Sequence, residues 1–123
     1  MNREISSHEL AYLGDAVLEV LVREHLVRDG SGGENASEAA LGYVTAAAQS
    51  DAFSAIEDKL TDEELDVYRR ARNNYHTSNV PKSASAVQYR RSTGFEAVFG
   101  YLYLAGREER LRELFRASFG LKQ

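Results

Sequence analysis

Two acidic residues lie in the middle of apolar stretches of this sequence. Asp15 is part of the segment LAYLGDAVLEVLV, and Glu96 is part of the segment TGFEAVFGYLYLA. An ionised carboxylate on a buried face is costly unless it is paired or holds a metal ion, so we expect each acid to have a specific partner. If the two segments are helices that cross, the carboxylates meet and form a metal site. The alternative is that each acid pairs with a buried Arg or Tyr side chain, and the spacing alone leaves both interpretations open.

Glycine residues accompany both acids. Gly14 directly precedes Asp15, and Gly94 and Gly100 flank Glu96. A glycine inside a helix costs about 1 kcal/mol relative to alanine, so its presence usually has a packing reason, and close helix crossing is such a reason. Two carboxylates at one spot raise each other's pKa unless a cation lies between them. Mg²⁺ is the expected cation, because it binds to one or two carboxylates and keeps its other positions for water and phosphate oxygens.

Length and composition favour one modest domain. The chain has 123 residues, a net charge of −4 and no cysteine, so disulfides, thiolate metal sites and cysteine nucleophiles are excluded. Its three histidines lack the spacing of zinc ligands. The polar N-terminus does not resemble a signal peptide, and no apolar run approaches the roughly 20 residues that span a bilayer. We expect one domain over residues 1–123, in a cytoplasmic protein that does not contact the membrane.

The distribution of charge along the chain is uneven. Residues 67–95 contain no Asp or Glu, although the whole chain has 19 acidic residues. Such a stretch is either a solvated basic loop or an anion-binding edge, most naturally for nucleic acid phosphates. Its basic residues are Arg69, Arg70, Arg72, Lys82, Arg90 and Arg91, together with His76.

Apolar residues recur with helical spacing through most of the chain. Leu10, Leu13, Val17 and Leu21 show this period in the first segment, and the sequence has no alternating strand pattern of any length. The fold class is therefore predicted to be all-α. Cap and breaker residues predict helices at about 7–27, 35–57, 61–72, 85–104 and 108–119, with capping boxes at Asn35 with Glu38 and at Thr61 with Glu64, a break at Gly106, and a long irregular connection over residues 73–84.

Several segments of the sequence resemble the ribonuclease III family. LAYLGDAVLE at residues 10–19 is similar to the family's signature helix, whose core is the tetrad Leu-Gly-Asp-Ala. FEA at residues 95–97, followed by GYLYL at residues 100–104, resembles the family's other acidic helix. The resemblance covers nearly the whole chain. Four further short segments narrow the resemblance to the Mini-ribonuclease III group, which lacks a double-stranded RNA-binding domain. These segments are Arg72-Asn73, Val80-Pro81-Lys82, Tyr89-Arg90 and Ser92-Thr93.

The resemblance implies a fold, an activity and a set of site residues. The chain is expected to be a single ribonuclease III-like helical endonuclease domain that forms a homodimer. The implied activity is cleavage of double-stranded RNA, with maturation of the 23S ribosomal RNA precursor as the expected task, Mg²⁺ as the cofactor and Mn²⁺ as a substitute. A ribosomal protein that presents the substrate is a further expected partner. Asp15 and Glu96 are the expected catalytic and metal-binding residues, and the expected RNA-binding residues are Arg69, Arg72, Asn73, Lys82, Tyr89 and Arg90.

The sequence departs from the longer ribonuclease III pattern at two positions. Four acids line the metal site in the full-length family, and here Ala11 and Thr93 stand at the positions that match two of them. Two carboxylates then remain as protein ligands, while Glu19, one turn after Asp15, either acts through water or is simply solvated. Two other functions remain open, a non-catalytic RNA-binding module on ribosomal particles and a helical dimerisation domain. The retained acids argue against the first, and the acid-free stretch 67–95 argues against the second.

Overall fold

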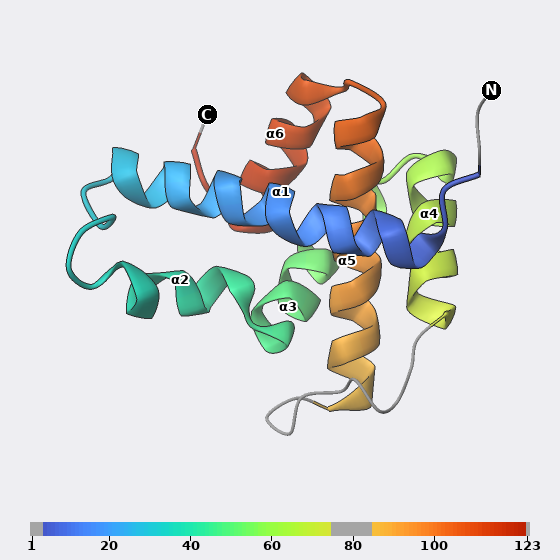
Figure 1. The fold of residues 1–123 in the computed structure, drawn as a ribbon, viewed down its shortest axis with the longest axis horizontal. Coiled ribbons are helices and arrows are strands. Elements are labelled where there is room, and N and C mark those ends of the chain that lie inside the picture. Colours follow the sequence, from blue (N-terminus) through green and yellow to red (C-terminus); the bar gives the residue numbers. More distant parts are fainter. Residues whose placement is uncertain (1–3, 75–84, 123) are drawn as a thin grey trace.

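The computed structural model describes residues 4–74 and 85–122, and every regular element in these two ranges is a helix (Figure 1). The all-α prediction is therefore confirmed. Within the described part of the chain, no helix is both long and apolar enough to cross a lipid bilayer. The helices in chain order are α1 (Ser7–Arg28), α2 (Ala36–Val44), α3 (Ala46–Ile56), the short 3₁₀ helix η1 (Glu57–Lys59), α4 (Asp62–Asn73), α5 (Ala86–Leu104) and α6 (Glu108–Ser118).

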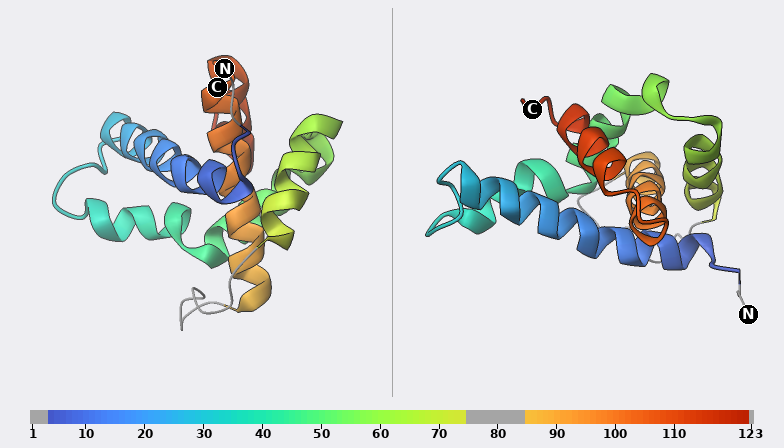
Figure 2. Two further views of the ribbon diagram at one scale, coloured as in Figure 1. Left: turned by 45° about the vertical axis from the view of Figure 1, so that its right-hand side comes forward. Right: turned by 90° about the horizontal axis from the view of Figure 1, so that it is seen from above.

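Helix α5 is the centre of the fold. It packs against α1, α3, α4 and α6, and Figure 2 shows from two further directions how α1 crosses it while α4 lies beside it. Phe95, Phe99 and Leu102 of α5 are fully buried. Apolar residues surround this helix instead of forming one stripe, which is typical of a helix enclosed by its neighbours. The acid Glu96 is therefore carried by the most enclosed helix of the molecule.

The helix ends agree with most of the sequence-based predictions. The first, third, fourth and fifth predicted helices match α1, α4, α5 and α6 to within one residue at each end. In the predicted capping box of α4, the Thr61 hydroxyl accepts from the Glu64 backbone N–H at 3.1 Å, and the Glu64 carboxylate accepts from the Thr61 N–H at 2.9 Å. Gly106 follows α5 with φ of +70°, a conformation that favours glycine. The predicted connection over residues 73–84 lies mostly outside the described residues, and Asn73 belongs to α4.

The predicted second helix is wrong in two respects. Residues 35–57 do not form one helix, because Thr45 takes an extended conformation (φ −73°, ψ 155°) between α2 and α3. The Thr45 hydroxyl accepts a hydrogen bond from the Ala48 backbone N–H at 3.1 Å, so this threonine starts a new helix as its N-cap. The capping box predicted at Asn35 is not formed, since its side chain makes no capping hydrogen bond.

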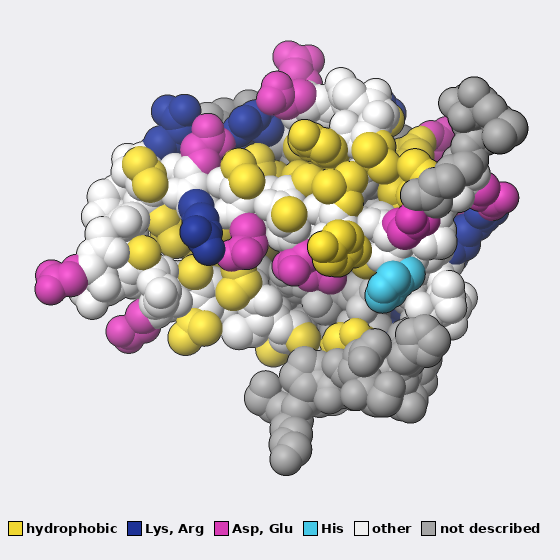
Figure 3. Space-filling model, viewed as in Figure 1, with side chains coloured by type: hydrophobic (Ala, Val, Ile, Leu, Met, Phe, Trp, Pro, Cys, Tyr) yellow, Lys and Arg dark blue, Asp and Glu magenta, His cyan; other side chains and the backbone are white. Residues whose placement is uncertain are grey.

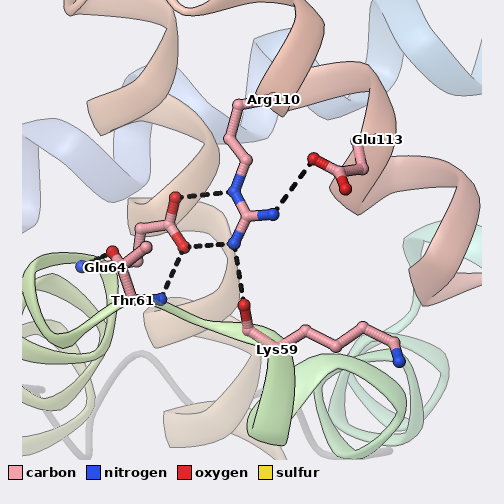
Figure 4. A network of polar contacts seen from close by, with 5 residues as sticks. All are labelled: Lys59, Thr61, Glu64, Arg110 and Glu113. Carbon is pink, nitrogen blue, oxygen red and sulfur yellow. Dashed lines mark hydrogen bonds and ion pairs between the residues drawn. The ribbon is translucent and has the colours of Figure 1, made fainter.

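A buried ion pair ties α4 to α6 (Figure 4). Glu64 is 0% exposed, and Arg110 donates to its two carboxylate oxygens at 2.7 and 2.9 Å. The same guanidinium donates to the Lys59 carbonyl oxygen at 2.8 Å and to Glu113 at 3.1 Å. Burial raises the pKa of Glu64, but the hydrogen bonds from Arg110 and the Thr61 backbone, together with the charges of Arg110 and Arg107, hold the pKa below its usual value. The pair therefore stabilises the fold while Glu64 is ionised.

Glu64→Gln is expected to lower the free energy of unfolding by about 3 kcal/mol, because it leaves the largely buried Arg110 charge without its counter-ion. Urea denaturation followed by circular dichroism measures the loss. Glu113→Gln is the matched control, since this exposed carboxylate contacts the same guanidinium and its removal should cost less than about 1 kcal/mol. Equal losses in the two variants would contradict a special contribution from the buried pair.

The buried pair also predicts a pH dependence of stability with a defined sign. Because the pKa of Glu64 is lower in the folded than in the unfolded chain, its stabilisation is complete above the unfolded value of about 4.3. The stabilisation is lost as the pH falls through the lowered folded-state pKa. The difference in unfolding free energy between the parent and Glu64→Gln should therefore shrink in acid, and a difference that stays constant from about pH 7 to about pH 3 would contradict this assignment.

Candidate active site

Helices α1 and α5 touch through their backbones at two glycines. A Cβ atom added to Gly14 would lie 1.7 Å from the Glu96 carbonyl oxygen, and one added to Gly100 would lie 2.0 Å from the Leu10 carbonyl oxygen. No carbon atom fits at either distance, so both positions require glycine if the helices are to cross this closely. The close crossing predicted from Gly14 and Gly100 is confirmed.

The third glycine of the prediction has a different neighbour. A Cβ atom added to Gly94 would lie 2.5 Å from Cδ1 of Tyr68 and 2.9 Å from the Tyr68 carbonyl oxygen. Gly94 therefore lets α4, and not α1, approach α5. The prediction that this glycine serves the crossing of the two acidic helices is wrong.

The crossing brings the carboxyl groups of Asp15 and Glu96 together. Glu96 is half-buried, and burial is the largest of the causes that raise its pKa to about 8. The negative charge of Asp15 and a hydrogen bond between the two carboxyl groups act in the same direction. Asp15 itself is exposed, on a face of α1 that also exposes Tyr12 and Glu19. The prediction that Asp15 lies on a buried face is therefore wrong, because the apolar residues around it belong partly to the surface.

The two carboxylates fit a divalent cation. Among residues 4–74 and 85–122, the charge that acts on the pKa of Glu96 is that of Asp15, and it raises this pKa, whereas a neighbouring arginine would lower it. The same part of the chain holds no group of three or more Asp, Glu, His or Cys residues that could hold a metal ion. A cation between the carboxylates would let both ionise and would activate a water molecule for attack on a phosphodiester.

Helix α4 reaches the same place through its last turn. Ala71 packs with Ala11 and Ala97, and all three alanines are buried. Ala97 follows Glu96 in α5, and Ala11 lies one turn before Asp15 in α1. The last turn of α4 therefore packs against both acidic helices, and the next two residues after Ala71 are Arg72 and Asn73, both predicted to bind RNA.

The predicted RNA-binding residues lie in the last two turns of α4 and the first two turns of α5, except Lys82, which is outside the described residues. Their side chains are unequally accessible. Those of Arg69 and Asn73 are exposed, and those of Arg72, Tyr89 and Arg90 are half-buried.

The remaining arginines of the acid-free stretch are held by other side chains. Arg70 pairs with Asp66 on the same helix at 3.1 Å. Arg91 donates from Nε to the Ser50 hydroxyl at 2.7 Å and from Nη2 to the Ser50 carbonyl oxygen at 2.8 Å, and it also donates to the Ser54 hydroxyl. The stretch is therefore not a uniform basic surface, because Arg91 binds α5 to α3.

No local pattern in the sequence indicates a second polar contact between α3 and α5. The Ser92 hydroxyl donates to Oε1 of Gln49 at 2.6 Å, and both residues are buried. The sequence shows only that Gln49 and Ser92 are polar residues on helix faces that are otherwise apolar, and it does not show that they contact each other. The partner lies 43 residues away in the chain, so only the fold reveals it.

A sequence profile of the Ribonuclease III domain matches residues 8–107, which include both acids and the glycines of the crossing. The chain belongs to the ribonuclease III family. A relative named Mini-ribonuclease 3 from Symbiobacterium thermophilum is 48% identical over 89% of this chain and 84% of its own length. The Mini-ribonuclease 3 of Brevibacillus brevis is 42% identical over 91% of this chain and 84% of its own length. A crystal structure of a protein from Fusobacterium nucleatum matches with a TM-score of 0.83 at 29% identity, over 93% of this chain and 91% of that one.

Membership of the ribonuclease III family makes this protein an endoribonuclease of that type. The resemblance to Mini-ribonuclease III is confirmed by curated relatives that cover most of the chain, including that of Streptococcus pneumoniae at 42% identity. The interpretations as a non-catalytic module or as a dimerisation domain alone are therefore set aside.

Gly14→Ala is expected to destabilise this ribonuclease by about 3 kcal/mol, because the new methyl group must displace the Glu96 backbone. Thermal and urea unfolding measure the effect. Gly42→Ala is the matched control, since Gly42 lies in α2 with nothing within 4 Å of an added Cβ, and alanine should raise helix stability there by up to about 1 kcal/mol. Parental stability in Gly14→Ala would show that the helices do not touch as described.

Proposed function

We propose that this protein is a magnesium-dependent endoribonuclease that cuts double-stranded RNA in the cytoplasm, with Mn²⁺ as a substitute, and that it matures the 23S ribosomal RNA precursor. We also propose that residues 1–123 form one catalytic domain and that two copies act together. The observation that carries the proposal is the meeting of Asp15 and Glu96 at the α1–α5 crossing. A pair of carboxylates is a donor set suited to Mg²⁺, which takes water and phosphate oxygens as its other ligands.

The two carboxylates have unequal surroundings and therefore different tasks. Asp15 is exposed, so it can accept a hydrated cation without a large desolvation cost. Glu96 is half-buried, and its backbone lies against Gly14, so its position is fixed by packing. Water is the nucleophile of this hydrolysis and the 3′ oxygen is the leaving group. Asp15 and Glu96 would therefore hold the cation, and the basic side chains would orient the RNA, without a covalent intermediate on the protein.

The proposed RNA surface makes backbone contacts and reads little sequence. Arginine and amide groups that bind phosphates fix the register of a nucleic acid but carry little base specificity. Duplex RNA in the A form is recognised mainly by its shape and its backbone, so such a surface suits a double-stranded substrate. Because Ala71 packs beside the acidic helices, phosphates bound at the end of α4 would lie close to the scissile one. The proposed contacts are Arg69, Arg72, Asn73, Lys82, Tyr89 and Arg90.

Cleavage of both strands of a duplex calls for two active sites, and an apolar surface on α1 supports a homodimer. Tyr12 and Val20 of α1 are 81% and 64% exposed, and Tyr103 of α5 is 57% exposed. Figure 3 shows apolar side chains gathered over the face that α1 crosses. A two-fold axis repeats one patch on both copies, so the protruding Tyr12 of one copy can enter a hollow on the other. A hollow of about 560 Å³ is lined by Leu13, Ala16, Val17, Val20, Tyr103 and Leu111 among others.

Asp15→Asn and Glu96→Gln are each expected to reduce cleavage of duplex RNA at least about 100-fold, because a neutral amide holds a cation poorly. Gel analysis of an end-labelled duplex, with Mg²⁺, with Mn²⁺ and with a chelator, measures the rate. Circular dichroism and sedimentation should show an unchanged fold and oligomeric state.

Glu19→Gln is the matched control for these two variants. Glu19 lies on the same helix one turn after Asp15, but it is exposed and pairs with Arg23 at 3.2 Å. Its replacement should leave the cleavage rate at the parental level. Parental activity in Asp15→Asn, or cleavage that continues in the chelator, would overturn the proposed site.

Val20→Glu is expected to convert the dimer into monomers, because it would bury an unpaired carboxylate at the interface. Sedimentation at micromolar concentration measures the oligomeric state. Leu41→Glu is the control, since Leu41 is an exposed apolar residue of α2 that does not line the hollow. A parent protein that sediments as a monomer would contradict the two-site proposal, even if it retains activity.

A further inference from the structure

Two aromatic rings and two guanidinium groups form a stack where α3, α4 and α5 meet. The rings of Phe53 and Tyr68 lie 3.7 Å apart with an interplanar angle of 5°, and both residues are 1% exposed. The guanidinium carbon of Arg91 lies 5.1 Å from the centre of the Phe53 ring, and that of Arg72 lies 5.5 Å from the centre of the Tyr68 ring. Both distances are in the range of cation–π contacts.

The stack is fixed at its Arg91 end. Arg91 donates hydrogen bonds to Ser50 and Ser54 of α3, so its guanidinium cannot follow a ligand. Tyr68 is fixed as well, because Gly94 leaves just enough room for its ring against α5. The Tyr68 hydroxyl is buried and makes no hydrogen bond within the described residues. The Arg72 guanidinium lies close enough to this hydroxyl to lower its pKa against the larger effect of burial, so Arg72 meets Tyr68 at its ring and at its hydroxyl.

The other end of the stack belongs to the last turn of α4, which packs against α1 and α5. Arg72 follows Ala71, whose buried contacts with Ala11 and Ala97 place the end of α4 at the α1–α5 crossing. Arg72 is half-buried, and its Nε donates to the Asn73 side chain at 3.1 Å. Its Nε is therefore engaged within the protein, and a guanidinium binds phosphate well through its terminal nitrogens.

We propose that this stack presets the Arg72 guanidinium to bind an RNA phosphate next to the acidic pair, with Tyr68 and Phe53 as positioning residues. The inference rests on the proposed function, since it assumes that Arg72 contacts duplex RNA. A side chain that is already ordered loses less conformational entropy when it binds, so the ring contributes to affinity without touching the RNA. Tyr68 then couples the buried core to the substrate surface.

A double-mutant cycle on the affinity for a fluorescently labelled RNA duplex tests the proposal. The measurement uses fluorescence anisotropy in an Asp15→Asn background, so that binding is separated from cleavage. Arg72→Gln should weaken binding about tenfold and lower the slope of log affinity against log salt by about 1. Tyr68→Leu should weaken binding about fivefold, the scale of one cation–π contact. The double variant should bind no more weakly than Arg72→Gln alone.

Two further variants separate positioning from loss of fold. Tyr68→Phe keeps the ring and should bind RNA like the parent. Fluorinated phenylalanines at position 68 keep its shape but withdraw electrons from the ring face, so affinity should fall with each added fluorine. Thermal unfolding confirms that each variant is folded at the assay temperature.

The outcomes distinguish this proposal from the proposed function. If Arg72→Gln leaves both affinity and salt dependence unchanged, Arg72 does not contact RNA, and the proposed RNA surface fails together with the inference. If Arg72→Gln weakens binding but Tyr68→Leu does not, only the positioning role is overturned. The positioning role is also overturned if the losses of RNA affinity in Arg72→Gln and Tyr68→Leu add up in the double variant, because the ring would then not act through Arg72. Equal losses of RNA affinity in Tyr68→Phe and Tyr68→Leu overturn it as well, because the ring alone would then not account for the effect.

Discussion

The backbone contact between α1 and α5 is the constraint on which the rest of this ribonuclease depends. Two helices can touch through their main chains only where no Cβ atom intervenes, and Gly14 and Gly100 provide that gap on both sides of the crossing. Asp15 follows the first glycine directly, and the main chain of Glu96 is the surface that Gly14 meets. The packing contact and the candidate active site therefore cannot change independently, because a displaced helix carries its carboxylate with it.

The same contact brings two acidic side chains close together, which is electrostatically unfavourable and is not needed for packing. It holds a half-buried carboxyl, Glu96, next to the charge of Asp15, and burial and charge together raise the pKa of Glu96 to about 8. Elsewhere in the molecule a buried acid is satisfied, as Glu64 is by the guanidinium of Arg110. Carboxyl groups that have a strongly shifted pKa and no such basic partner are typical of functional sites. The contrast between the fully buried Glu64 and the half-buried Glu96 supports the proposal that the chemistry takes place at the α1–α5 crossing.

The sequence by itself determined the helical class and most helix ends, and it predicted that the two acids could meet without deciding it against separate buried partners. Apolar periodicity and capping boxes act within one or two turns, so the box at Thr61 could be recognised without the fold. Gly14 and Gly100 signalled a close crossing because a mid-helix glycine has a local cost that needs a reason. The motif around Asp15 indicated the family, and the comparison with that family at Ala11 and Thr93 led to the prediction of a site with few carboxylates.

Only the tertiary structure decided which side chains face one another. Asp15 proved to be exposed because one side of α1 remains uncovered, and Gly94 proved to serve Tyr68 because α4 packs on that side of α5. Arg91 was counted with a basic surface, but it binds α3 through Ser50, 41 residues earlier in the chain. Periodicity shows which face of a helix is apolar but not which helix covers it. Contacts between residues this far apart depend on how all the helices pack together, and no local pattern contains that information.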